Sequence, residues 1–419
     1  MSATTAVSLT DKLAAAKRAS VALATASTLQ KNAALEAIAA AVESSADRIL
    51  PANELDLANG RENGLSTGLI DRLTLSQSRL DGLASAVREV ISLPDPVGDV
   101  VRGSTLPNGL QLTQVRVPFG VIGAIYEARP NVTIDIASLA LKSGNAVVLR
   151  GGSAAEQTNR VLVDLLQDAF ESAGLPRDAV QTIDEFGREG ARELMAARGY
   201  IDVLIPRGSA QLIDTVVRES KVPVIETGAG VVHVYLDESA PEQMAVDIVV
   251  NAKTQRPSVC NAAETLLVHR AAANRLIPPV LAALRERDVL LHGDGRTLSL
   301  FPDAELATEE DWSIEHMALE MNVKIVDSLD EAVDHIRTYS TKHTEAIVTN
   351  DLANAELFIS LVDSAVVMVN ASTRFTDGGE FGFGAEVGIS TQKLHARGPM
   401  GLQELTSTKW IVRGNGQVR

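Results

Sequence analysis

The segment QRPSVCNAAE, residues 255–264, holds the only cysteine in a chain of 419 residues. A lone Cys260 is either a nucleophile or a small apolar core residue, and by residue type alone packing is the commoner role. Its context favours the nucleophile. We expect a helix to end near Lys253 and a strand to begin near Glu264, which leaves Cys260 in a proline-containing connection between two lobes. Nucleophiles are often mounted on such turns, so Cys260 is the first candidate for catalysis.

A second segment, VVLRGGSAAEQTN, has residue types that suit phosphate binding. A strand of buried type delivers Arg150, Gly151 and Gly152 into a helix that we expect to begin near Ser153. A helix N-terminus with an adjacent arginine attracts phosphate. Glycines at strand ends, including Gly208, also let a ligand approach the backbone, although each taken singly is an ordinary turn glycine.

Other polar residues have weaker signals. Glu226, in VPVIETGAG, follows an expected strand and is either a general base or a solvated strand end in a salt bridge. His233, His335 and His343 do not fall into a metal-ligand spacing, and a single cysteine removes most zinc-site options. We therefore predict no metal. The glycine-rich stretch 377–402 is too long for a plain turn, so it is a functional loop or a subunit contact.

Composition limits the class of protein. The chain is 45% hydrophobic, 22% charged and 3% aromatic, which is typical of a folded protein with aliphatic cores, and its length predicts two or three domains. A formal charge of −16 makes nucleic acid and anionic membranes poor partners. One cysteine cannot form an internal disulfide, and we find no signal peptide or membrane-spanning stretch. We expect a soluble cytoplasmic protein.

The elements that position these residues change along the chain. Residues 10–90 have apolar positions at helical spacing, with Thr10 and Ser66 as candidate N-caps. From Val121 onward, β-branched runs alternate with helical patterns, which predicts βαβ units and a mostly parallel sheet. The expected strands of this part are VIGAIYE, AVVLRGG, AVQTI, IDVLIP, VPVIE and VVHVYLD. After Asp237 the alternation resumes, so a second α/β unit is expected.

A different pattern interrupts the first unit. Residues 99–120 contain two alternating runs around LPNGL, and Asn108-Gly109 is a strong hairpin signal. A hairpin of this kind often reaches a neighbouring subunit.

Several longer segments resemble one known family. They are YEARPNVTIDIASLALKSGNAVVLRGG, LIPRG, QRPSVCNAAETLL, the segment from Val326 to Ile347, and FTDGGEFGFGAEVGISTQKLHARGPMGL. Together they resemble the γ-glutamyl phosphate reductases, also called glutamate-5-semialdehyde dehydrogenases, from about Leu9 to near Lys409. This family belongs to the aldehyde dehydrogenase superfamily. The resemblance therefore implies an α/β fold with a Rossmann-like cofactor domain, an α/β catalytic domain and a small oligomerisation hairpin.

We assign domains on that basis. Residues 1–98 and 118–228 are expected to form the cofactor-binding domain, and residues 229–395 the catalytic domain. Residues 99–117 and 396–419 are the expected oligomerisation elements, so the resemblance implies a homo-oligomer.

The resemblance also implies roles for site residues. Cys260 takes the position of the superfamily's nucleophile. Arg150 falls where relatives place a lysine that contacts the adenosine ribose, and RGGS replaces the usual Lys-Pro-Ser/Ala-Glu. That glutamate binds both ribose hydroxyls of NAD and would repel a 2′-phosphate, so its absence favours NADP. For the oxyanion hole, EARPN offers Arg129 by straight alignment and Asn131 after a small shift, and we choose Asn131.

The full set of expected cofactor contacts is Arg150, Gly151, Gly152, Ser153, Arg207, Gly208 and Glu315. Glu315 lies near the superfamily's second ribose-binding glutamate.

The implied activity is the NADPH-dependent reduction of L-glutamate 5-phosphate to L-glutamate 5-semialdehyde and phosphate through a cysteine thioester. This is the second step of proline biosynthesis, and glutamate 5-kinase is a candidate partner for channelling. One alternative is a hydrolytic NAD(P)-dependent aldehyde dehydrogenase that uses Glu226 to activate water. Another is a non-catalytic nucleotide-binding or scaffold protein that has kept the fold.

Overall fold

A computed structural model describes residues 7–419, which fold into two compact units. Unit 1 contains the described residues up to Glu226, together with Gly382–Gly388 and Met400–Arg419. Unit 2 contains Thr227–Phe381 and Ile389–Pro399. Each unit has its own parallel sheet with helices packed against it, as the alternating pattern predicted.

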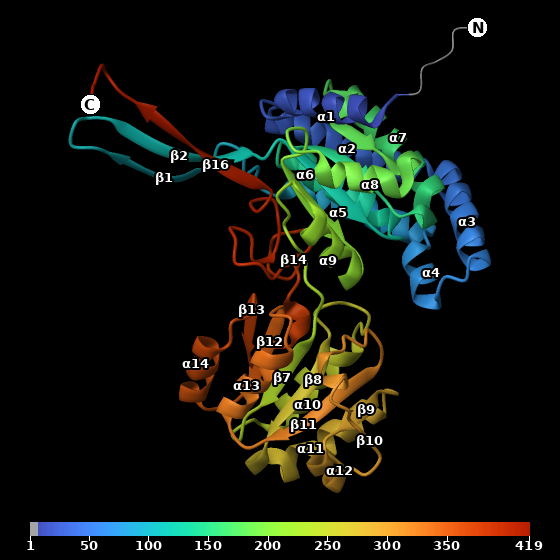
Figure 1. Ribbon diagram of the computed structural model, residues 1–419, viewed down its shortest axis with the longest axis vertical. Coiled ribbons are helices and arrows are strands. Elements are labelled where there is room, and N and C mark those ends of the chain that lie inside the picture. The colour runs from blue at the N-terminus through green and yellow to red at the C-terminus, as the bar shows by residue number, and fades with distance from the viewer. Residues whose placement is uncertain (1–6) are drawn as a thin grey trace. The chain divides into compact units, whose positions relative to one another are not determined.

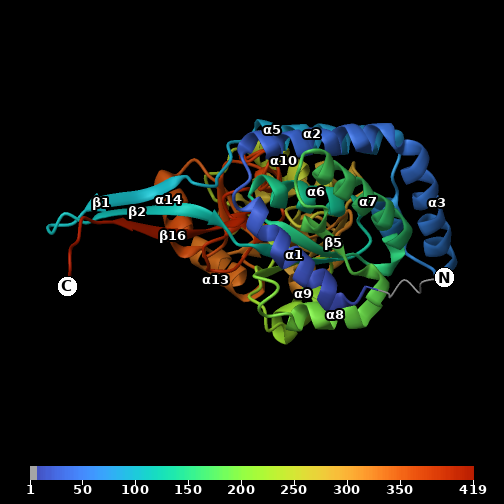
Figure 2. The same ribbon diagram turned by 90° about the horizontal axis from the view of Figure 1, so that it is seen from above.

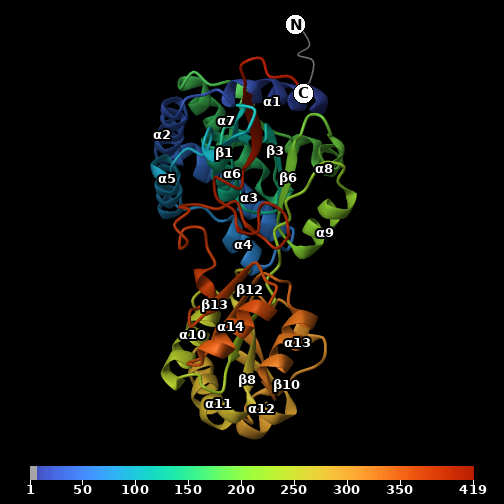
Figure 3. The same ribbon diagram turned by 90° about the vertical axis from the view of Figure 1, so that its left-hand side faces the viewer.

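Unit 1 begins with a run of helices: α1 (Leu9–Leu23), α2 (Thr28–Ser44), α3 (Ala46–Glu62), α4 (Thr67–Leu73) and α5 (Gln77–Ser92). Helices α2 and α5 pack side by side (Figure 3). The predicted cap at Ser66 is confirmed, because its side chain accepts the Leu69 N–H. The predicted cap at Thr10 is wrong. Ser8 forms a capping box with Asp11, so α1 already includes Thr10.

The parallel sheet of unit 1 has the strand order β5–β4–β3–β6. Its strands are β3 (Val121–Tyr126), β4 (Ala146–Arg150), β5 (Val180–Thr182) and β6 (Val203–Arg207). The connecting helices are α6 (Pro130–Lys142), α7 (Glu156–Ser172), α8 (Gly187–Ala196) and α9 (Ala210–Glu219). The chain runs from β3 to β4 on one side and places β6 on the other. A switch of this kind marks the carboxyl edge where ligands bind in open α/β sheets.

The predicted hairpin is confirmed. Strands β1 (Val100–Thr105) and β2 (Gln111–Pro118) are antiparallel, and Gly109 between them has φ +86°, which favours glycine. Strand β16 (Thr406–Arg413) pairs with the other edge of β2. This three-stranded sheet extends away from the helices of unit 1 (Figures 1 and 2).

Unit 2 contains a seven-stranded parallel sheet with the order β10–β9–β11–β8–β7–β12–β13. Its strands are β7 (Val232–Leu236), β8 (Ala263–His269), β9 (Leu290–Gly293), β10 (Glu305–Leu306), β11 (Glu320–Val326), β12 (Thr344–Val348) and β13 (Val366–Val369). Its helices are α10 (Glu242–Thr254), α11 (Arg270–Arg285), α12 (Gly295–Leu300), α13 (Leu329–Tyr339) and α14 (Leu352–Leu361). Its larger core cluster is aliphatic, as the scarcity of aromatic residues predicted, while a second cluster includes Tyr235 and Phe358.

One predicted strand is wrong. The run VPVIE, residues 222–226, forms only an isolated bridge between Val224 and Leu204. Pro223 has no N–H to donate, which shortens the ladder that this run makes with β6. Glu226 therefore follows an irregular segment and not a strand.

The glycine-rich stretch 377–402 is mostly irregular, and its regular elements are the short antiparallel strands β14 (Ile389–Ser390) and β15 (Gly398–Pro399). Among the helices of residues 7–419, none combines the length and apolar composition needed to cross a membrane.

Candidate active site

Cys260 lies in the loop that joins the end of α10 to the start of β8, as the sequence predicted. Both elements belong to unit 2, so the expectation of a connection between lobes is wrong. The chain enters unit 2 at Thr227, well before this loop. Cys260 is half-buried, which leaves the thiol partly accessible.

The Cys260 loop precedes β8 and so lies at the amino edge of the parallel sheet. The segments that precede β7, β11 and β12 reach the same edge, because amino ends of parallel strands share one side. Gly230 donates its N–H to Glu315 Oε1 at 2.8 Å, and Val231 donates to Thr341 Oγ1 at 3.0 Å. A Cβ added at Gly230 would lie 1.5 Å from the Cys260 carbonyl oxygen. Only glycine fits against the nucleophile here.

The contact of Glu315 bears on its predicted role. One of its carboxylate oxygens accepts the Gly230 N–H, and Gly230 packs directly on Cys260. The carboxylate is thus oriented by the segment that supports the nucleophile. Contact with the cofactor ribose stays a prediction.

A buried ion pair brackets the Cys260 loop, and sequence reasoning missed it. Lys253 Nζ donates to Glu264 Oε2 at 2.8 Å, and the two side chains are 0% and 1% exposed. Burial raises the pKa of Glu264 to about 7, against the opposing effect of Lys253. Burial also lowers the pKa of Lys253, while Glu264 opposes this shift. Because Lys253 lies in the last turn of α10 and Glu264 is the second residue of β8, the pair fixes both ends of the loop. The only signal in the sequence was two opposite charges in otherwise apolar segments.

Unit 1 brings its predicted cofactor residues to one edge of its sheet. In the register of the strands, Arg150 pairs with Ile125 and Arg207 pairs with Tyr126, so the two arginines end β4 and β6 on either side of β3. Helices α6 and α9 begin at the same carboxyl edge, after β3 and β6. This arrangement is the expected location of a nucleotide in a doubly wound sheet.

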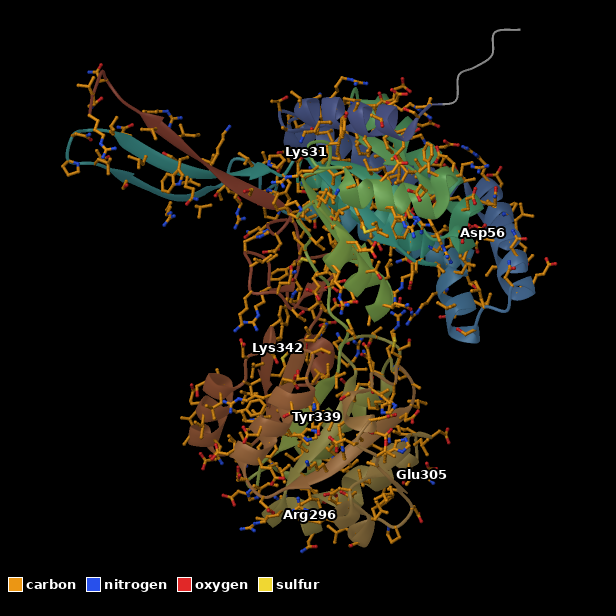
Figure 4. All side chains as sticks on the ribbon, viewed as in Figure 1. Lys31, Asp56, Arg296, Glu305, Tyr339 and Lys342 are labelled. Carbon is orange, nitrogen blue, oxygen red and sulfur yellow. The ribbon has the colours of Figure 1, made fainter. Side chains whose placement is uncertain are left out.

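The loop after Arg150 is held by carboxylates of the protein. Gly151 donates its N–H to Asp184 Oδ1 at 2.6 Å, and burial raises the pKa of Asp184. At the start of α7, Asp56 (labelled in Figure 4) accepts the N–H groups of Gln157 at 3.2 Å and Thr158 at 2.8 Å. These amides are therefore engaged by protein carboxylates, whereas the helix start expected near Ser153 is the short 3₁₀ turn Ser153–Ala155 ahead of α7, and phosphate binding there stays a prediction. Arg150 supports the prediction of phosphate binding at this edge, because its Nε is buried and has no hydrogen-bond partner among the described residues.

The glycines of this edge have packing reasons of their own. A Cβ at Gly151 would meet Asn159 Nδ2 at 2.1 Å, and one at Gly208 would meet the Glu127 carboxylate at 2.8 Å. Glu127 also accepts the N–H and the hydroxyl of Ser209, each at 2.9 Å. Glu127, which sequence reasoning did not single out, thus fixes the start of α9.

Asn131, the predicted oxyanion donor, lies in the first turn of α6 in unit 1. Its side-chain Nδ2 donates to Asp135 Oδ2 at 3.0 Å. Burial raises the pKa of Asp135 to about 6, and the bond from Asn131 and the charge of Arg207 oppose this shift. An amide nitrogen carries two N–H groups, so this bond fixes the orientation of Asn131 and leaves the second N–H for another acceptor.

The three histidines that were considered as metal ligands, His233, His335 and His343, are buried in unit 2. His233 Nδ1 lies 3.1 Å from Glu345 Oε2, and both side chains are buried. Burial lowers the pKa of His343 to about 4 and that of His335 to about 2. In residues 7–419, no group of three or more His, Cys, Asp or Glu side chains is placed to hold a metal ion.

Comparison with known proteins identifies the family to which this chain belongs. The profile of the aldehyde dehydrogenase family matches residues 1–294. The chain is 71% identical over 99% of both chains to gamma-glutamyl phosphate reductase of Leifsonia xyli. The corresponding protein of Clavibacter michiganensis is 67% identical, over 97% of this chain and 94% of its own length.

A solved structure agrees. The crystal structure of gamma-glutamyl phosphate reductase from Thermotoga maritima superposes with a TM-score of 0.95 at 45% identity, covering 98% of this chain and 99% of its own. The chain therefore belongs to the aldehyde dehydrogenase family and, within it, to the γ-glutamyl phosphate reductases.

Proposed function

We propose that this chain reduces L-glutamate 5-phosphate to L-glutamate 5-semialdehyde with NADPH and releases phosphate, the second step of proline biosynthesis. The observation that carries the proposal is the 71% identity to a gamma-glutamyl phosphate reductase over 99% of both chains. The placement of Cys260 supports it, since the thiol is half-buried in a loop whose two ends are fixed by a buried ion pair.

Cys260 is the nucleophile of the proposed mechanism. Its thiolate attacks the acyl carbon, the new S–C bond forms, the C–O bond to the phosphoryl group breaks, and phosphate leaves. The thioester that remains on Cys260 is then reduced. When the tetrahedral oxyanion collapses, the S–C bond breaks, the aldehyde is released and the thiolate is restored.

The oxyanion needs hydrogen-bond donors that are fixed before the reaction. We assign this role to the backbone N–H of Cys260 and the second side-chain N–H of Asn131. The bond from Asn131 to Asp135 supports the assignment, because it removes the freedom of the amide to flip. Arg129 is the alternative donor.

NADPH supplies the hydride when it is bound. We propose that Arg150, Gly151, Gly152, Ser153, Arg207, Gly208 and Glu315 hold the cofactor. The buried Nε of Arg150, without a partner among the described residues, supports a contact with the 2′-phosphate. RGGS offers no carboxylate of its own to repel that phosphate.

We also propose that the chain forms a homo-oligomer through β1, β2 and β16. The outer strands of this sheet have free edges, and Val100, Trp410 and Val412 are exposed on it. Glutamate 5-kinase remains a proposed partner for channelling.

Oxidation of the semialdehyde with and without phosphate tests the proposed activity. The reductase run in reverse consumes phosphate, so we expect NADP reduction only when phosphate is added. A hydrolytic aldehyde dehydrogenase would instead oxidise the semialdehyde to glutamate without phosphate, and that result would overturn the proposal.

A further inference from the structure

Two arginines of unit 2 are associated with the loop that carries the nucleophile. Arg256 is on the Cys260 loop itself. Arg374 comes from the short turn Thr373–Phe375, yet its Nε donates to Gln255 Oε1 of the same loop at 2.7 Å, across 119 residues of sequence. Both arginines are outside the set that the family resemblance supplied.

The turn that carries Arg374 is held on both sides of Cys260. Gln255, which precedes Cys260, accepts from the guanidinium. Asn261, which follows Cys260 directly and is buried, donates its Nδ2 to the Thr376 carbonyl at 2.8 Å. These two bonds, both within unit 2, hold the turn of Arg374 against the Cys260 loop.

Charges of both signs surround Arg374. The guanidinium of Arg374 gives its Nε–H to a neutral amide and not to a carboxylate. Burial lowers the pKa of Arg374, and the positive charge of Arg256 adds to that effect, while Asp377, the Cys260 thiolate and Glu380 oppose it. Arg374 is half-buried, so its charge is less well screened than that of a surface arginine. A guanidinium held against the loop of a nucleophile can bind an anionic group of the substrate, and Arg256 adds a second positive charge that offsets the carboxylates of Asp377 and Glu380.

We propose that Arg374, together with Arg256, binds the phosphoryl group of the acyl phosphate, and inorganic phosphate in the reverse direction. This inference rests on the proposed function. A phosphoryl group has the charge and the planar oxygen pairs that guanidinium groups bind in a bidentate manner.

The position of the arginines selects the phosphoryl group over the substrate's α-carboxylate. The phosphoryl group is joined to the reacting carbonyl carbon through a single oxygen, whereas the α-carboxylate is separated from it by three carbons. A cation close to the attacking sulfur therefore faces the phosphoryl group. In the forward direction the arginines stabilise the charge of the departing phosphate. In reverse they hold phosphate while its oxygen attacks the thioester, the S–C bond breaks and the thiolate is restored.

The reverse reaction tests the proposal, because phosphate and semialdehyde are then separate substrates. In Arg374→Ala we expect the KM for phosphate to rise about ten- to a hundredfold, as for loss of a charge-assisted contact, with the KM for semialdehyde nearly unchanged. Arg374→Lys keeps the charge but loses the bidentate geometry, so it should recover part of the affinity. Arg337→Ala, an exposed arginine of the same unit, is the matched control.

A rise in the KM for semialdehyde with an unchanged KM for phosphate would overturn the proposal, since it would assign Arg374 to the α-carboxylate. The proposal is also overturned if neither KM changes in Arg374→Ala. If the wild type oxidises semialdehyde without phosphate, the proposed function fails and this inference fails with it. If the wild type requires phosphate and Arg374→Ala keeps its normal KM, only the inference fails.

Alkylation of Cys260 gives a readout that needs no turnover. Phosphate should protect the thiol of the wild type from iodoacetamide, and Arg374→Ala should need about ten- to a hundredfold more phosphate for half-protection. The phosphate concentration for half-protection is compared, and not the alkylation rate, because removal of a nearby cation also changes thiol reactivity. If Arg374→Ala does not fold, Arg256→Ala serves in the same two assays. Protection at the wild-type phosphate concentration in a folded variant would count against the site.

Discussion

The buried pair Lys253–Glu264 makes a prediction that depends on pH. Lys253→Met keeps most of the side-chain volume but removes the ammonium that lies 2.8 Å from Glu264 Oε2. The carboxylate is then left buried, at 1% exposure, without its cation. Breaking a buried pair from one side costs about 3–5 kcal/mol of unfolding free energy when the remaining group is charged.

The pH dependence follows from the pKa of Glu264. Burial raises that pKa from the ordinary 4.5 to about 7, so the folded protein holds the proton more tightly than the unfolded chain. The stability from this proton is fully present below about pH 4.5 and is lost as the pH rises through about 7. The difference between the folded and unfolded pKa values of Glu264 corresponds to about 3 kcal/mol of unfolding free energy. At pH 5 Glu264 is mostly protonated, so Lys253→Met should cost only about 1 kcal/mol, the value of a hydrogen bond.

At pH 8 the same substitution should cost about 3–5 kcal/mol, because without Lys253 the buried carboxyl must either stay charged without a cation or hold a proton that the unfolded chain has lost at this pH. Burial also lowers the pKa of Lys253, so the comparison stops at pH 8, below the range in which an ordinary lysine titrates.

Urea unfolding followed by tryptophan fluorescence measures the loss of unfolding free energy in Lys253→Met at pH 5 and at pH 8. The chain has two tryptophans, Trp312 in unit 2 and Trp410 in the exposed sheet of unit 1. In a Trp410→Phe background the signal reports on unit 2, which contains the pair. The double variant Lys253→Met/Glu264→Met removes both charges and should recover more than half of the loss at pH 8. Equal costs at pH 5 and pH 8, or a double variant as unstable as the single one, would refute this account of the pair.

The remaining predictions concern the proposed reaction. Cys260→Ser should lose more than about 10²-fold in reductase activity with an unchanged circular dichroism spectrum, because a serine hydroxyl is a far weaker nucleophile; a smaller loss would remove the assignment. Asn131→Ala should lower kcat about 10²- to 10³-fold, the usual cost of one oxyanion donor, whereas an effect confined to KM would favour Arg129. Arg150→Ala should reduce the preference for NADPH over NADH about ten- to a hundredfold in kcat/KM, and equal use of both cofactors by the wild type would contradict this. Glu226→Gln should keep reductase activity within about tenfold, since reduction has no hydrolytic step, and a thousandfold loss would favour the hydrolytic dehydrogenase.

The parts of the fold that the sequence predicted are those set by local pattern. The run Val121–Tyr126 is rich in β-branched residues and is buried along its whole length, which is typical of a parallel strand covered on both faces. The hairpin followed from Asn108-Gly109, because few other dipeptides suit the positive φ of such a turn. The end of α10 and the start of β8 were also predicted correctly, and Cys260 was placed between them for the right local reason.

The errors come from tertiary context. The run VPVIE has strand composition, but the proline leaves it able to pair only around Leu204. Gly151 and Gly208 also have a packing reason that the sequence did not show, because a Cβ at these positions would meet Asn159 and Glu127, while their contact with a cofactor stays a prediction. A glycine in a sequence indicates that there is little room for a side chain at that position, but it does not indicate which neighbouring residue occupies the space.

The charged residues around Cys260 show why a nucleophile is easier to predict from sequence than the residues that surround it in the fold. A unique cysteine is visible in the sequence, and so is its turn. Arg374 lies in STRFT, a segment without any motif, and its contact with Gln255 spans 119 residues. No periodicity or spacing connects two residues so far apart. What brings them together is the return of the chain after β13 toward the loop before β8, where Asn261 binds the Thr376 carbonyl. Arg374 therefore becomes visible as a neighbour of the Cys260 loop only once the fold has brought the two segments together.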